Sequence, residues 1–157
     1  MVQDQNCEKL NKLIDETYKT IAEKEESKVR SNAHLNITNS ELHLMEKISS
    51  FGEEGCTITM LAHSLSCALS SVTVAVNKLV KKGYVIKERC PTDKRELRVS
   101  LSKQGNKINT VHLYIHKRIG RGIAKSFTEE EQEILIRGLE RIIEIFKNDL
   151  LYTGDKK

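Results

Sequence analysis

The sequence predicts a mainly α-helical fold with one small β-hairpin, and three observations support this class. Apolar residues recur at the spacing of amphipathic helices towards both ends of the chain. In the middle, two short segments with strand character flank a basic link that holds the only proline. Two short helical segments come directly before them. Two helices followed by a hairpin make a winged helix-turn-helix, here flanked by long helices suited to dimerisation.

The N-terminal part predicts two helices. A first amphipathic helix is expected over about residues 5–31, since its apolar residues are spaced three or four apart: Leu10, Leu13, Ile14, Tyr18 and Ile21. Thr38 and Glu41 form a T-x-x-E capping box that starts a second helix, which we expect to end at Gly52.

The helix-turn-helix and its hairpin follow. We expect Thr59 to cap a short third helix, and a fourth to run from about Leu69 to Lys82 before Gly83. Residues 84–90 and 96–101 are expected to be strands, and residues 91–95 the tip of the wing.

Two long helices complete the chain. Ser102 is expected to cap the fifth, and Thr128 with Glu131 forms a second capping box for the sixth. The sixth carries an apolar stripe expected to face inward: Leu135, Leu139, Ile142, Ile143, Phe146 and Leu150. Without repeats or linkers, residues 1–157 are expected to form a single domain, with a winged-helix lobe at 38–101 and dimerisation helices at 5–31 and 103–151. Their apolar surface exceeds what one small lobe can cover, so we expect a homodimer.

The net charge of +4 excludes a uniformly basic, nonspecific coat for nucleic acid. Positive charge is instead concentrated between Lys78 and Lys103, with nine basic residues against three acidic ones, which is typical of a surface that faces phosphates. No apolar run reaches the roughly 20 residues of a membrane span, and no signal peptide is evident, so a cytoplasmic location without a membrane partner is expected. The four cysteines are far apart, and we expect two or three to be buried thiols.

The order of elements resembles the MarR family of bacterial transcriptional regulators over nearly the whole chain. The most specific residues are Asp93 and Arg95 in D-K-R, followed by L-R-V-S-L-S-K-Q-G, which is similar to the wing of that family. The segments SSVTVAVNKLVKKGY and NSELHLM look most like the family's repressors of fatty-acid synthesis genes.

The fourth helix is expected to read DNA. Val72, Val76, Leu79 and Val80 share one face and should lie in the core, which leaves a polar face towards DNA: Ser70, Ser71, Thr73, Val74, Asn77 and Lys81. Asn77 could read adenine with both amide atoms, and Val74 could contact a thymine methyl group. The resemblance implies that Asp93 orients a wing side chain, while Lys94 or Arg95 enters the minor groove.

One further group of residues suggests an effector site. His112 and His116 are four apart on the fifth helix, so both imidazoles can reach one ion, while His43 and Glu25 lie at or along other apolar stripes. These four match in spacing the metal site of zinc-sensing MarR repressors. A hydrogen-bonded polar cluster without metal is the alternative. A third hypothesis is a redox switch at Cys7 or Cys90. Its alternative is that these cysteines are inert buried thiols.

These features predict a sequence-specific, homodimeric repressor that binds an inverted repeat of double-stranded DNA, and no catalytic motif is present. The resemblance implies control of fatty-acid synthesis genes through a fatty-acyl or acyl-carrier-protein effector. A zinc-responsive repressor of metal-uptake genes and a winged helix that binds protein are the alternatives. The sequence leaves the target genes, the effector and its direction of action open.

Overall fold

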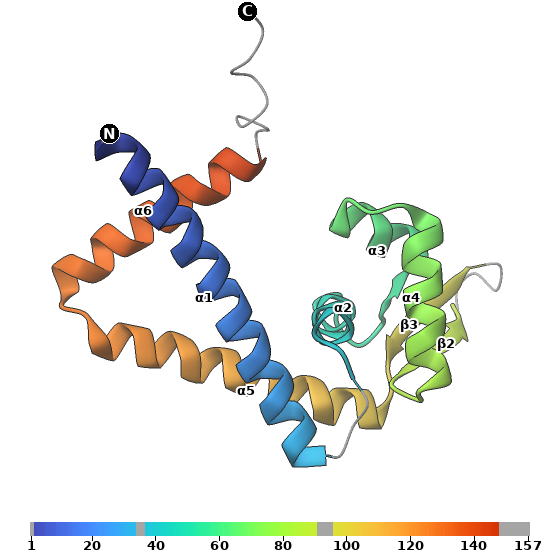
Figure 1. The fold of residues 1–157 in the computed structure, drawn as a ribbon. Coiled ribbons are helices and arrows are strands. Elements are labelled where there is room, and N and C mark those ends of the chain that lie inside the picture. Colours follow the sequence, from blue (N-terminus) through green and yellow to red (C-terminus); the bar gives the residue numbers. More distant parts are fainter. Residues whose placement is uncertain (1, 34–36, 91–95, 148–157) are drawn as a thin grey trace, which may run out of the picture. The chain divides into compact units, whose positions relative to one another are not determined.

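The computed structural model describes residues 2–33, 37–90 and 96–147 of the chain (Figure 1). Most of them are helical: α1 (Val2–Ala33), α2 (Asn39–Ser49), α3 (Ile58–Leu65), α4 (Leu69–Lys81), α5 (Lys103–Ser126) and α6 (Glu129–Lys147). The strands are β1 (Cys56–Thr57), β2 (Val85–Arg89) and β3 (Leu97–Leu101). This confirms the expected class, a mainly α-helical winged helix-turn-helix with long helices at its ends.

The chain divides into two compact units, Met1–Ile115 and His116–Lys157, with the boundary inside α5. The first unit contains the winged-helix lobe, in which α4 packs against α3 and β2, and α2 packs against β3 (Figure 1). The second unit consists of the end of α5 together with α6.

The sheet of the lobe has three antiparallel strands in the order β1-β3-β2. The hairpin pairs Val85 with Leu101 and Arg89 with Leu97, while the two-residue strand β1 pairs Cys56 with Val99. Strand β1 could not be predicted from sequence, because two residues are too short for an alternating pattern.

The core of the lobe draws side chains from α2, α3, α4 and the sheet. The fully buried ones include Leu42, Met45 and Ile48 of α2, Leu61 of α3, Val76 and Leu79 of α4, and Val85 and Val99 of the sheet. These apolar side chains fix where α4 lies and therefore which of its faces stays in solvent.

Local hydrogen bonds confirm three of the expected helix starts. Thr38 and Glu41 form the reciprocal capping box of α2, and Thr128 and Glu131 form the same box before α6. Ser102 Oγ accepts from the Gly105 backbone at 3.0 Å in the first turn of α5.

Two expected helix boundaries were wrong. The cap of α3 is Thr57, whose Oγ1 accepts from the Met60 backbone at 3.0 Å, and not Thr59, which lies inside the helix. Helix α2 ends at Ser49, three residues before Gly52, because residues 50–55 form turns in which Gly52 and Gly55 take positive φ angles of 81° and 67°.

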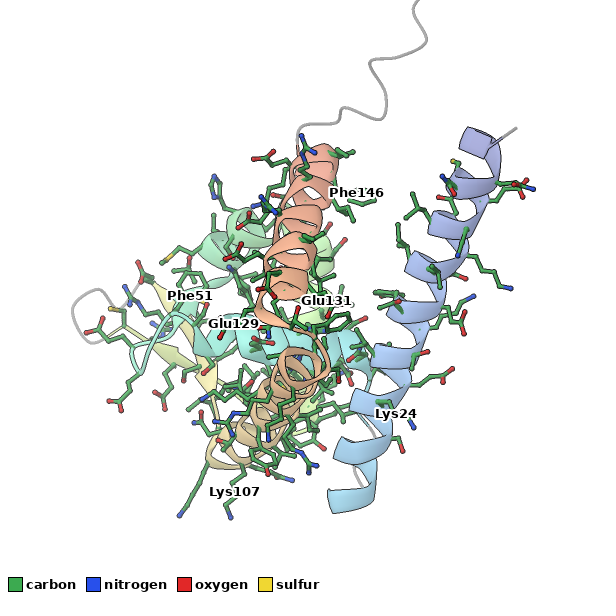
Figure 2. The ribbon with its side chains drawn as sticks, turned by 90° about the vertical axis from the view of Figure 1, so that its left-hand side faces the viewer. Lys24, Phe51, Lys107, Glu129, Glu131 and Phe146 are labelled. Atoms are coloured by element: carbon green, nitrogen blue, oxygen red, sulfur yellow. The ribbon has the colours of Figure 1, made fainter. Side chains whose placement is uncertain are left out.

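The apolar stripe of α6 is not buried within one chain, contrary to the expectation that it faces inward. Leu139, Ile143 and Phe146 are each at least half exposed, whereas Leu135 and Ile142 are half-buried. Figure 2 shows Phe146 projecting from the helix near its end, with Glu129 and Glu131 at its start. Leu150 lies outside the described residues.

Among the described helices, none is by itself long and apolar enough to cross a membrane; only α3 and α4 taken together, bent by 116°, reach that length and composition.

Candidate DNA-binding surface and histidine cluster

Helix α4 divides into a buried and an exposed side. Val72, Val76 and Leu79 are at most 4% exposed, whereas Val80 is only half-buried and contributes less to the core than its spacing indicated. Because the buried side is fixed by the core, the opposite side must face outward.

The exposed side carries the side chains that the sequence assigned to DNA. Ser70, Ser71, Val74, Asn77 and Lys81 are exposed, and Thr73 is half-buried. Val74 is 68% exposed, which is unusual for an apolar side chain surrounded by polar ones. A duplex laid on this face would meet hydroxyl and amide groups beside one apolar contact.

The start of α4 leaves its first-turn backbone groups open. Its N-cap is Ala68, whose side chain makes no capping hydrogen bond, and the preceding turn passes through Ser66 at a positive φ of 51°. Uncapped N–H groups at a helix N-terminus favour an anion such as a backbone phosphate. Thr73 does not contribute a donor there, because its Oγ1 donates to the Leu69 carbonyl at 2.7 Å.

Asn77 makes a contact that the sequence did not indicate. Lys87 on β2 donates from Nζ to Asn77 Oδ1 at 2.6 Å, which joins the exposed face of α4 to the hairpin. The two residues are ten apart in sequence and on different elements, so helical and strand periodicity could not reveal their approach.

Not all of the basic residues in this region are available to DNA. Lys82 Nζ donates to both carboxylate oxygens of the buried Glu41, at 2.7 and 2.8 Å. Burial would raise the pKa of Glu41, but the hydrogen bonds from Lys82 and from the Thr38 backbone outweigh it and lower that pKa. Lys82 therefore ties the end of α4 to the start of α2.

Arg98 on β3 is also engaged. Its guanidinium donates to Glu96 at 2.5 Å and lies 3.5 Å from the Glu54 carboxylate. The expected wing residues Asp93, Lys94 and Arg95 lie outside the described residues.

A histidine cluster lies where α2 meets α5. His112 is completely buried and its Nε2 is 3.2 Å from Glu46 Oε2, which is also 3.7 Å from His43 Nδ1. The rings of His43 and His112 meet edge to face with centroids 5.2 Å apart. The ligand atoms of His43, Glu46 and His112 all lie within 4.8 Å of one another, and His116 is one turn further along α5.

This group could hold a metal ion, but the carboxylate in it differs from the one that the sequence suggested. The side chain of Glu25, in α1, lies outside the described residues. Glu46 was missed, although it follows His43 by three residues and shares its helix face. That spacing was the available signal.

None of the four cysteines, all of which lie among the described residues, forms a disulfide. Cys56 and Cys90 are buried, whereas Cys7 and Cys67 are exposed, which agrees with the expectation that two or three are buried. Burial raises the pKa of Cys56, which disfavours its reactive thiolate.

Comparisons with known proteins agree with this architecture. The model of the MarR family matches residues 37–97, which cover most of the lobe. The transcriptional regulator PchR of Bacillus subtilis is 22% identical over 140 residues, which make up 87% of this chain and 78% of PchR.

Solved structures show the same fold. FabT of Streptococcus pneumoniae in complex with DNA is 24% identical, with a TM-score of 0.81 over 90% of this chain and 97% of that one. The MepR–DNA complex of S. aureus is 19% identical, with a TM-score of 0.70 over 85% of this chain and 96% of the other. MarR of E. coli is 24% identical, with a TM-score of 0.60 over 85% and 96% of the two chains.

Proposed function

Because this chain carries the winged-helix domain of the MarR family, a family of DNA-binding regulators and not of enzymes, we propose that it is a homodimeric repressor that reads an inverted repeat. The observation that supports this best is the outward face of α4, where Asn77, Val74 and the two serines gather on a helix anchored by Val76 and Leu79. Such a helix fits the major groove.

The test is selection of binding sites from random duplex DNA, followed by affinity measurements against salt. Neutralising several phosphates with lysine and arginine should make the logarithm of affinity fall steeply with the logarithm of salt concentration. An inverted repeat with half-sites about one helical turn apart, roughly 34 to 36 Å, is expected. If no duplex is enriched above the background, a protein-binding winged helix becomes the better reading.

The wing is proposed to support binding on the basis of sequence resemblance. Asp93 would orient Arg95, while Lys94 or Arg95 enters the minor groove and senses its width. Replacing Arg95 by Ala should then weaken binding to many duplexes by a similar factor. If the affinity of this variant were unchanged at every salt concentration, the wing would not contact DNA.

Dimerisation is supported by exposed apolar faces in each of the two units. On α1, Leu10, Leu13, Ile14 and Tyr18 are between 45% and 73% exposed, and α6 buries none of its residues. An amphipathic helix with a solvated apolar stripe is unfavourable, and a second copy of the chain could cover these faces.

Control of fatty-acid synthesis genes, with a fatty-acyl or acyl-carrier-protein effector, rests on the resemblance of the helix sequences alone. Mapping the selected operator onto the genome would test this proposal, which requires operator sites upstream of such genes.

A regulator of this kind acts where the chromosome is, and so in the cytoplasm.

A metal effector is a second candidate, favoured by the close approach of His43, Glu46 and His112. Two imidazoles and a carboxylate are a ligand set that suits zinc, and the four-residue spacing from His112 makes His116 a candidate fourth ligand. His112 is completely buried, so an ion here would link α2 to α5 within the first unit.

Calorimetric titration with zinc, alone and in the presence of operator DNA, tests this candidate. One ion per subunit is expected, with weaker binding at acid pH because a protonated imidazole cannot ligate. If Glu46 is the ligand, Glu46→Gln should weaken zinc binding and Glu25→Gln should not. The opposite result would identify Glu25 as the carboxylate that binds zinc. If no zinc binds, the group is a hydrogen-bonded polar network that stabilises the contact of α2 with α5.

A further inference from the structure

The contact between Asn77 and Lys87 determines which groups α4 offers to a base. Asn77 is exposed on the outer face of α4, and Lys87 reaches it from β2 with Nζ 2.6 Å from Oδ1. An ammonium group has three donors and no acceptor, so it can only approach the oxygen of the amide. The hydrogen bond from Lys87 therefore determines the orientation of the Asn77 amide, with Oδ1 towards Lys87.

This orientation interferes with the usual use of asparagine in the major groove. Asparagine recognises adenine by accepting from the N6 amino group with Oδ1 and donating from Nδ2 to N7. Oδ1 has a second lone pair, so the hydrogen bond alone does not block adenine. The positive charge of Lys87 disfavours adenine, because the partly positive N6 amino hydrogens would have to approach the same oxygen beside the ammonium group.

The groups of Asn77 and Lys87 that remain available to contact a base are hydrogen-bond donors. They are the two hydrogens of Asn77 Nδ2 and the hydrogens of Lys87 Nζ that do not bond Oδ1. Guanine offers two acceptors, N7 and O6, on its major-groove edge, whereas adenine offers one acceptor and one donor. A pair of adjacent donors therefore matches guanine.

Both side chains are held by rigid elements, so the pair is formed before DNA arrives. Asn77 directly follows the buried Val76, and Lys87 is paired with Val99 in the centre of the hairpin ladder. Lys87 is half-buried, which limits the freedom of its long side chain. Less conformational entropy is lost when a preorganised donor pair meets a base.

We propose that Asn77 and Lys87 act as one base-reading unit that selects guanine over adenine at the base pair it faces. This deepens the proposed DNA-binding function and depends on it. Lys87, on a strand of the hairpin and outside the recognition helix, thereby becomes a specificity-determining residue.

Site selection with wild type, Lys87→Met, Lys87→Arg and Asn77→Ala, followed by affinities for operators that differ at one base pair, tests the proposal. Wild type should prefer guanine at one position of each half-site, by roughly 5- to 150-fold over adenine. Lys87→Met should lose that preference and favour adenine there, since Asn77 regains both amide atoms. Lys87→Arg, which keeps the charge and the donors, should retain guanine, and Asn77→Ala should weaken the preference.

Lys81→Met is the matched control, because it removes one exposed cation from α4 itself. It should lower affinity for all duplexes and reduce the salt dependence without changing base preference. Enrichment of no duplex by wild type would overturn the proposed function. Enrichment of one operator with the same base preference in wild type and Lys87→Met would overturn only the base-reading unit.

Discussion

Gly105 lies in the first turn of α5, where the helix backbone passes directly over that of Tyr84. A Cβ atom at this position would lie 2.0 Å from the Tyr84 carbonyl oxygen, which also accepts from the Ser102 backbone at 2.9 Å. Any side chain must therefore push apart α5 and the start of β2.

We predict that Gly105→Ala lowers the free energy of unfolding by about 1 to 3 kcal/mol, the usual cost of overpacking. Gly120, also on α5, has nothing within 4 Å of its virtual Cβ and serves as the control. Gly120→Ala should raise the free energy by about 0.5 to 1 kcal/mol, because alanine favours the helix. Urea unfolding of both variants measures this, and equal effects would contradict the close approach.

Glu41 gives the lobe a defined response to acid. Its pKa is lowered in the folded protein, so the ionised carboxylate contributes stability that is present above the ordinary value of 4.5 and is lost as pH falls through the folded value. We predict that Glu41→Gln and Lys82→Met each destabilise the protein at pH 7 by about 1 to 3 kcal/mol.

The effect of Glu41→Gln should shrink as pH falls from 4.5 through the lowered pKa of folded Glu41, since protonation then removes the charge of the wild-type carboxylate. Chemical unfolding at pH 7 and at pH 3.5 measures the difference. A cost of Glu41→Gln that does not change with pH would show that the charge of Glu41 is not what stabilises the lobe.

At the scale of elements, the helix starts show what sequence can and cannot reveal. Thr38 with Glu41 and Thr128 with Glu131 were predicted correctly because a capping box is a local pattern of four residues. The cap of α3 was assigned to Thr59 instead of Thr57, because both are threonines before apolar residues. The choice is made by β1, which holds Thr57 in extended backbone through pairing with Arg98, far along the chain.

Thr57→Ala should therefore destabilise the protein by about 1 kcal/mol, the typical cost of losing an N-cap. Thr59→Ala removes the same atoms from an exposed position within α3 and should change stability by less than about 0.5 kcal/mol. Thermal unfolding of the two variants under identical conditions compares them. If Thr59→Ala destabilised the protein more than Thr57→Ala, Thr59 would be the cap of α3.

For the whole molecule, sequence predicted the class and order of elements because each has a strong period or a local cap. Periods and caps did not predict contacts made between elements, and the grouping of His43 with His112 came from the resemblance to zinc-sensing repressors. Glu46 beside His112 and Lys87 beside Asn77 join residues on different elements, and no periodicity within one element encodes such an approach. The exposed stripe of α6 also has the pattern of a core helix, since burial by a second copy and burial within one chain leave the same pattern.

We predict that Leu139→Glu shifts the protein to monomers at micromolar concentration and abolishes tight binding to the inverted repeat. Leu139 is half exposed on the apolar stripe of α6, where a charge would be buried in a dimer. Arg137→Glu adds a negative charge two residues away, on a different side of the helix, and should leave the dimer intact. Sedimentation and operator binding measure both, and a dimeric Leu139→Glu would place the interface elsewhere.

The two-residue strand β1 has a consequence for the operator. Cys56 and Thr57 pair with β3 of the hairpin, and Thr57 is at once the cap of α3, so sheet and helix-turn-helix share a residue. In the proposed complex with DNA, the groove contacts of α4 and those of the hairpin would therefore be held at a fixed distance from each other. One base pair inserted within a half-site should consequently weaken binding, because Thr57 couples the sheet directly to α3 and this coupling resists a change in that distance.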